Sequence, residues 1–118
     1  MIDYRLFNEV NGVVVVVVRG RLNSEGSQFF WDCIEGQIED GNKKLVVDCS
    51  EVEYISSVGL GALVRAHSRM KKMGGNVKLA AVRGIVIEAI QLVGLGHVFH
   101  IYSTVAEACA AFEEESAP

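Results

Sequence analysis

The sequence contains few of the residues that mark disordered, secreted or metal-binding proteins. It has one proline in 118 residues, and half of its residues are hydrophobic, a composition typical of a compact soluble domain. Its three cysteines, Cys33, Cys49 and Cys109, are odd in number and show no Cys-x-x-Cys spacing, and its three histidines are scattered. These patterns favour buried, reduced thiols, and we expect no metal site.

Positive charge and long apolar runs are scarce as well. Eleven Lys and Arg against 15 Asp and Glu leave a net charge of −4, without a basic stripe. A nucleic-acid partner is therefore not expected, and the charge argues against anionic membranes. The valine run at residues 13–18 is far shorter than the roughly 20 apolar residues of a membrane-spanning helix. Because residues 1–12 show no signal-peptide pattern, we expect a cytoplasmic protein.

Motifs of nucleotide binding and of catalysis are absent or incomplete. Gly59-Leu-Gly61 lies at a strand-to-helix junction, but no third glycine follows at the dinucleotide spacing. A Gly-x-x-x-x-Gly-Lys-[Ser/Thr] phosphate loop is missing. Gly-x-Ser-x-Gly is missing too, because Ile55 stands where Ser57 would need the first glycine. We therefore expect no catalytic residue and no cofactor.

The hydrophobic pattern predicts an α/β chain of about five strands and four helices. An N-terminal β-hairpin turning at Asn11-Gly12 would be followed by parallel βα units with right-handed crossovers. The six-valine run suits a strand that is covered on both faces. The predicted strands cover 2–8, 13–18, Leu45–Cys49, Asn76–Ala81 and Val98–Ile101. The predicted helices cover 25–40, a segment from Ser57 to a stop at Gly74-Gly75, Ile85–Val93, and a last segment capped by Ser103 or Thr104.

No linker or change of composition divides the chain. We therefore predict a single domain over residues 1–113, followed by a frayed tail over 114–118. The first helix would be capped by Asn23 or Ser24. The apolar segment Ile85–Val93 indicates either a second contact face suited to self-association or a loosely packed short helix.

The most informative segment, residues 45–63, joins a buried strand to an amphipathic helix. The link between them ends in the paired serines Ser56 and Ser57. A hydroxyl at the start of a helix meets unsatisfied backbone N–H groups and the positive end of the helix dipole. Such a serine is an N-cap, and the same place favours an added phosphate. Asp48 is expected to accept hydrogen bonds from loop amides near Ser50, which would support the site loop structurally.

The signature of STAS domains, the anti-sigma factor antagonist family, resembles the string LVVDCSEVEYISSVGLG at residues 45–61. The family pattern is an apolar strand, Asp-Leu-Ser, an apolar-x-apolar link, and then Asp-Ser-Ser/Ala-Gly-Leu. Gly20-Arg-Leu-Asn23 is similar to the family's Gly-x-Leu-Asp turn, and residues 98–108 are similar to its C-terminal strand and helix. The spacing between these blocks also fits, so the resemblance covers most of the chain.

The resemblance implies a STAS-type fold and a regulatory switch without enzymatic activity. In such proteins the serine two residues before the glycine, here Ser57, is phosphorylated by a serine kinase that doubles as an anti-sigma factor. The unmodified form binds this kinase and releases its sigma factor, the phosphorylated form does not, and a metal-dependent serine phosphatase resets the switch. The expected partner-binding residues are Asn23, Ser24, Ser56, Ser57, Gly59, Leu60 and Gly61.

Some details of this surface stay open. Two acids of the family pattern are replaced by Asn23 and Ser56, which would alter the phosphorylation rate or the choice of partner if those acids orient the kinase. Gly59 and Gly61 would admit a partner backbone closely, or would serve helix–sheet packing. Leu60 is either a core residue or an interface residue.

Two other functions also stay open. The first is a non-phosphorylated STAS adaptor, a subunit of a transport or stressosome-like assembly in which Ser57 is never modified. The second is a small α/β enzyme or nucleotide binder, which a titration with ATP or GTP would reveal.

Overall fold

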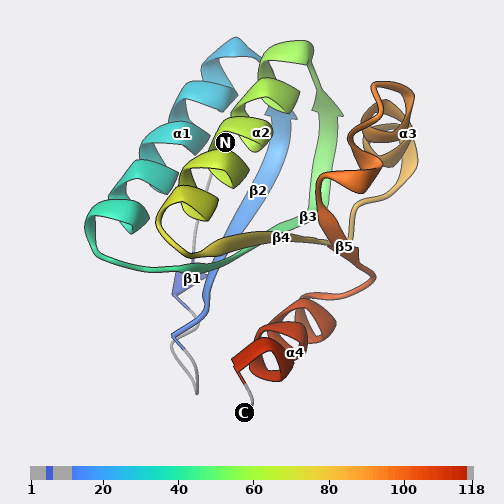
Figure 1. Cartoon of the computed structure of the whole chain (residues 1–118). Coiled ribbons are helices and arrows are strands. Elements are labelled where there is room, and N and C mark those ends of the chain that lie inside the picture. Colours follow the sequence, from blue (N-terminus) through green and yellow to red (C-terminus); the bar gives the residue numbers. More distant parts are fainter. Residues whose placement is uncertain (1–4, 7–11, 117–118) are drawn as a thin grey trace.

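The computed structural model describes residues 5–6 and 12–116. In this part of the chain one sheet has the strand order β1-β2-β3-β4-β5 (Figure 1). The strands are β1 Arg5–Leu6, β2 Val14–Leu22, β3 Lys44–Ile55, β4 Asn76–Ala80 and β5 His100–Tyr102. The helices are α1 Ser24–Glu39, α2 Ser57–Lys72, α3 Gly84–Leu92, the 3-10 turn η1 Leu95–His97, and α4 Val105–Ser116. β1 pairs antiparallel with β2, and β2 to β5 are parallel neighbours, so the predicted α/β class is confirmed.

The valine run places alternate side chains on the two faces of the sheet, as the period of a strand requires. Val14, Val16 and Val18 belong to the larger apolar core, which includes residues of α1, α2 and α3. The other three valines, at 13, 15 and 17, belong to a smaller core with Ala108 and Phe112 of α4. All six are buried, which confirms the prediction of a strand covered on both faces.

The strands β2, β3 and β5 differ from their predicted bounds by more than one residue. The strand predicted over 13–18 is β2, which runs from Val14 to Leu22 because residues 19–22 also pair with β3. β3 was predicted to end at Cys49, but it continues to Ile55 because its second half pairs with β2, from Glu51 opposite Arg19 to Ile55 opposite Leu22. In this half the exposed Glu51 and Glu53 alternate with the half-buried Val52 and Tyr54, a period-two pattern that is typical of a strand and that the prediction missed. β5 runs from His100 to Tyr102 instead of Val98–Ile101, because η1 covers Leu95–His97 and Val98 caps its end.

The two ends of the chain are only partly described. β1 and its antiparallel pairing agree with the predicted hairpin, whereas Asn11 lies outside the described residues and Gly12 has φ +65°. At the other end Thr104, not Ser103, caps α4 through a 3.1 Å bond from the Glu107 N–H. α4 runs through Ser116, and the division into 1–113 and 114–118 stays a prediction. None of the described helices is long and apolar enough to cross a membrane.

Helix α3 leaves much of its apolar surface in solvent. Val86 and Ile90 face the core, but Ile85 is 62% exposed, Leu92 86% and Val93 57%. Figure 1 shows α3 beside the β5 edge of the sheet, with α2 between it and α1. The predicted choice between a second contact face and loose packing therefore stays open.

Candidate functional site

The starts of α1 and α2 lie next to each other because two parallel strands end together. Leu22, the last residue of β2, is opposite Ile55, the last residue of β3. Each strand is followed by one extended capping residue, Asn23 or Ser56, and then by a helix. Figure 1 shows α1 and α2 side by side, both starting at this end of the sheet. The geometry therefore brings two helix N-termini, and their positive dipole ends, to one place.

The structure identifies which polar side chains cap these helices. The Asn23 Oδ1 accepts a hydrogen bond from the Gly26 N–H at 3.0 Å. The Ser56 Oγ accepts from the Gly59 N–H at 3.1 Å and donates to the Leu22 carbonyl at 2.9 Å. The caps are thus Asn23 and Ser56, so Ser24 and Ser57 are left out of the capping.

Ser57 occupies the first helical position of α2 and is exposed. Its counterpart Ser24, at the first position of α1, is exposed as well. The first turn of α2 carries no acidic residue, so nothing in that turn opposes a negative group at Ser57. The Ser57 hydroxyl is therefore reachable, and a phosphate there would be stabilised by the helix start.

Two glycines allow the helix starts to approach the strand ends. A Cβ on Gly59 would lie 2.5 Å from the Leu22 carbonyl oxygen, and one on Gly26 would collide with the Arg21 carbonyl. Glycine is therefore required at position 59 for the packing of α2 against the end of β2. Gly26 was missed in the sequence, although a glycine follows each cap at the same distance, in Leu-Asn-x-x-Gly and in Ile-Ser-x-x-Gly.

Of the remaining residues predicted to bind a partner, Leu60 is buried and Gly61 is exposed. Leu60 is 9% exposed and belongs to the large core, whereas Gly61 is exposed and a Cβ there would meet no atom within 4 Å. The exposed part of the predicted surface therefore consists of Asn23, Ser24, Ser57 and Gly61, with Ser56 half-buried between them.

A groove between α1 and α2 adjoins Ser57 and was not predicted. Its lining residues are Ser27, Gln28, Trp31, Val58, Gly61, Ala62 and Arg65. The Arg65 guanidinium lies 3.9 Å from the centre of the Trp31 ring. No local motif marks this groove in the sequence, because it exists only once two separate helices pack.

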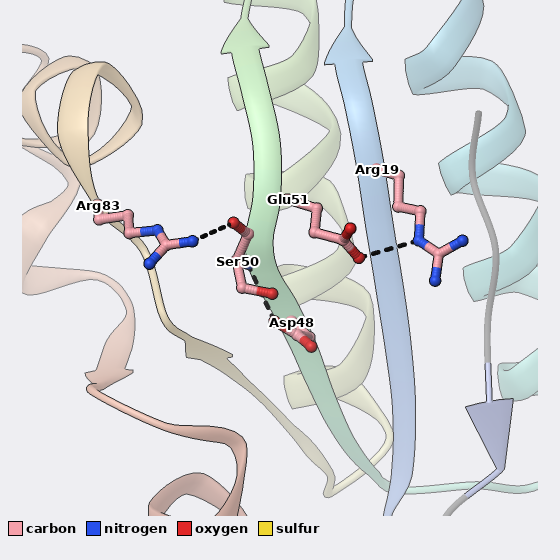
Figure 2. A network of polar contacts seen from close by, with 5 residues as sticks. All are labelled: Arg19, Asp48, Ser50, Glu51 and Arg83. Atoms are coloured by element: carbon pink, nitrogen blue, oxygen red, sulfur yellow. Dashed lines mark hydrogen bonds and ion pairs between the residues drawn. The ribbon is translucent and has the colours of Figure 1, made fainter.

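Asp48 supports the strand behind the site. Its Oδ1 accepts a hydrogen bond from the Ser50 N–H at 3.0 Å, as predicted, although Ser50 belongs to β3 and not to a loop. Figure 2 shows the neighbouring contacts: Arg83 donates to the Ser50 carbonyl at 2.8 Å, and Arg19 pairs with Glu51 at 2.9 Å. β4 pairs with β3 only as far as Asp48, so Arg83 satisfies a carbonyl on the part of β3 that extends beyond β4.

Two of the three cysteines are held in the thiol form by burial. Burial raises the pKa of the Cys49 thiol to about 12 and that of the Cys33 thiol to about 11, so both stay protonated at neutral pH. In residues 5–6 and 12–116, no group of three or more His, Cys, Asp or Glu is placed to hold a metal ion.

The fold and the site define a class of protein. The STAS domain profile matches residues 4–108, and the chain belongs to the STAS domain family. It is 34% identical to RsfB, an anti-sigma-F factor antagonist of Mycobacterium tuberculosis, over 83% of this chain and 80% of that protein.

Solved structures agree with this assignment. An anti-sigma factor antagonist from Mycobacterium paratuberculosis superimposes with a TM-score of 0.81 at 28% identity, over 94% of this chain and 93% of that one. The Bacillus cell fate determinant SpoIIAA in its phosphorylated form superimposes with a TM-score of 0.72 at 18% identity, over 93% and 99% of the two chains. The latter likeness concerns the fold alone.

Proposed function

We propose that this chain is an anti-sigma factor antagonist that is switched by phosphorylation of Ser57. One observation carries the proposal: Ser56 takes the capping hydrogen bonds of α2, so the exposed Ser57 is left available to a kinase. The relatives named as anti-sigma factor antagonists support the regulatory role. The unmodified form binds an anti-sigma factor serine kinase, and the phosphorylated form releases it.

The position of Ser57 lets a phosphate change the surface without unfolding the domain. A phosphate adds about −1.5 to −2 charges at pH 7. The N-terminus of α2 tolerates this charge, since its first N–H groups and its dipole lie beside Ser57, whereas the first turn of α1 carries the acidic Glu25. The added charge therefore acts on the docking partner, through repulsion and through the cost of removing water from the phosphate.

The two neutral caps suit this role. Asn23 and Ser56 stand where the family pattern has acids, and both make the capping bond that an aspartate would make. Their neutrality removes two negative charges beside Ser57. The fold keeps its caps, and the site becomes more favourable to a phosphate.

The kinase supplies ATP and magnesium, and this chain supplies the acceptor hydroxyl and the docking surface. A metal-dependent serine phosphatase restores the unmodified state. The exposed part of the docking surface is formed by Asn23, Ser24, Ser57 and Gly61. Gly59 and Leu60 support it from below.

The test is phosphorylation by the purified cognate anti-sigma factor kinase with ATP, followed by intact-mass measurement. We expect one phosphate on the wild-type chain and none on Ser57→Ala. Ser24→Ala is the matched control, because Ser24 is an exposed serine at the same helical position of α1, and it should be labelled like the wild type. Full labelling of Ser57→Ala would contradict the proposal, and a wild-type chain that is never labelled would favour the adaptor function.

A further inference from the structure

A notch in the surface of α2 opens beside Ser57. Ser57, Gly61 and Arg65 are spaced four residues apart in α2 and therefore form one ridge of the helix. Because Gly61 has no side chain and nothing lies within 4 Å of its ideal Cβ position, the ridge is interrupted there. The interruption leads into the groove between α1 and α2, which we call the α1–α2 groove.

The wall of the α1–α2 groove holds a polar atom that has no partner. Ser27 is 4% exposed, and its hydroxyl makes no hydrogen bond with any described residue. The neighbouring amide of Gln28 is already used, since it donates to Asp32 at 2.9 Å. The Ser27 oxygen is closed to solvent, so a ligand in the groove does not reach it, and Ser27 serves only as part of the wall.

The rest of the groove combines apolar surface with positive charge. Val58 is 52% exposed at the mouth, and Ala62 and Trp31 are buried. The Arg65 guanidinium stacks on Trp31 at 3.9 Å, and Arg69 lies 5.9 Å from the same ring. A stacked guanidinium is held in place and keeps its edge N–H groups free for a carboxylate.

We propose that the α1–α2 groove binds an apolar side chain of the anti-sigma factor kinase. That anchor enters at Gly61 and packs beside Val58 and Ala62, and a neighbouring acidic side chain of the same segment pairs with Arg65. The inference rests on the proposed function, because the groove shares its ridge with Ser57. The groove then supplies affinity and selects the partner, while Ser57 at its mouth decides whether the partner can dock.

The test fills the notch without disturbing the fold. Gly61→Leu places a side chain in open space and improves the helix propensity of α2, so the variant should be at least as stable as the wild type. We expect its dissociation constant for the purified kinase to rise by about tenfold or more, the loss typical of a blocked anchor.

Gly36→Leu is the matched control. Gly36 is also a helical glycine with nothing within 4 Å of its ideal Cβ, and it does not line the groove. The affinity of the Gly36→Leu variant for the kinase should equal that of the wild type. Fluorine NMR gives a second measurement. Trp31 is the single tryptophan of the chain, so labelling with 5-fluorotryptophan places one fluorine signal in the groove. Adding unlabelled kinase should shift this signal in the wild type but not in Gly61→Leu.

The outcomes separate the two proposals. If Gly61→Leu binds as tightly as the wild type while Ser57→Asp binds weakly, the groove inference is overturned and the switch at Ser57 stands. If neither substitution changes the affinity, or if the wild type does not bind the kinase, the proposed function itself is overturned.

Discussion

The hydroxyl of Ser56 lies 2.9 Å from the carbonyl oxygen of Leu22, 34 residues earlier in the chain. The same carbonyl also accepts the Ser56 N–H at 3.0 Å. Since the Ser56 oxygen accepts from Gly59 as well, this side chain ties the start of α2 to the end of β2. The structural task and the regulatory task are thereby divided between two adjacent serines.

Because of this division, replacing Ser56 with alanine should destabilise the fold much more than replacing Ser57. Ser56→Ala loses a cap and a hydrogen bond between elements, so the free energy of unfolding should fall by about 1–2 kcal/mol. Ser57→Ala removes an exposed hydroxyl and should change it by less than about 0.5 kcal/mol. Urea unfolding of both variants checks this, and equal losses would mean that Ser57 shares the capping.

Gly59 and Gly61 should respond oppositely to alanine. In Gly59→Ala the new Cβ would meet the Leu22 carbonyl and the Ile55 side chain, at 2.5 and 2.9 Å, which should cost about 2 kcal/mol or more. Gly61→Ala meets no atom within 4 Å and should stabilise the helix by about 0.5–1 kcal/mol. Thermal unfolding measures both, and a tolerated Gly59→Ala would refute the packing role of that glycine.

Restoring the acids of the family pattern should alter the phosphorylated state, and Ser56→Asp also loses the hydrogen bond that Ser56 donates to the Leu22 carbonyl, which should lower stability. Asn23→Asp with Ser56→Asp keeps residues that cap well but adds two negative charges beside Ser57. The second pKa of the phosphate should then rise above its value in the otherwise unchanged phosphoprotein, because like charge disfavours the dianion. A phosphorus NMR titration of both phosphoproteins shows this, and coincident curves would place the phosphate far from the two caps.

His67 should make the fold sensitive to acid. Burial lowers the pKa of His67 from its ordinary 6.5, with smaller contributions from Lys71 and His100; its ring packs edge-on against Phe99, with centroids 5.6 Å apart. The unfolded chain therefore binds more protons at His67 than the folded chain does just below pH 6.5. Its contribution to stability is complete above that pH and is lost as the pH falls toward the folded pKa.

Urea unfolding at pH 7.5 and 5.5 measures this effect. The loss of unfolding free energy between the two pH values should be smaller in His67→Gln than in the wild type. His97→Gln is the control, since His97 is exposed on η1, and it should lose as much as the wild type. An unchanged pH dependence in His67→Gln would show that other groups cause the acid sensitivity.

The sequence predicts those features that depend on local chemistry. Alternating burial of the valines and the hydrogen bond of Asp48 follow from residue type and spacing. The sequence also indicates a polar cap for each helix, but the choice of Asn23 over Ser24 and of Ser56 over Ser57 comes from the structure. The second half of β3 was missed, although Glu51 and Glu53 alternate with Val52 and Tyr54 as in a strand; only its register against β2 depends on the folded sheet. The α1–α2 groove was not predicted, because it forms between two helices that meet only after folding. Its stacked pair, for example, joins Trp31 of α1 to Arg65 of α2.

The most direct test compares the affinity of the purified kinase for the unmodified chain and for the chain phosphorylated at Ser57, by calorimetry without ATP. The unmodified chain should bind at least about tenfold more tightly, the equivalent of 1.4 kcal/mol, and circular dichroism should show the same folded state for both. Equal affinities for two correctly folded forms would contradict a switch at Ser57.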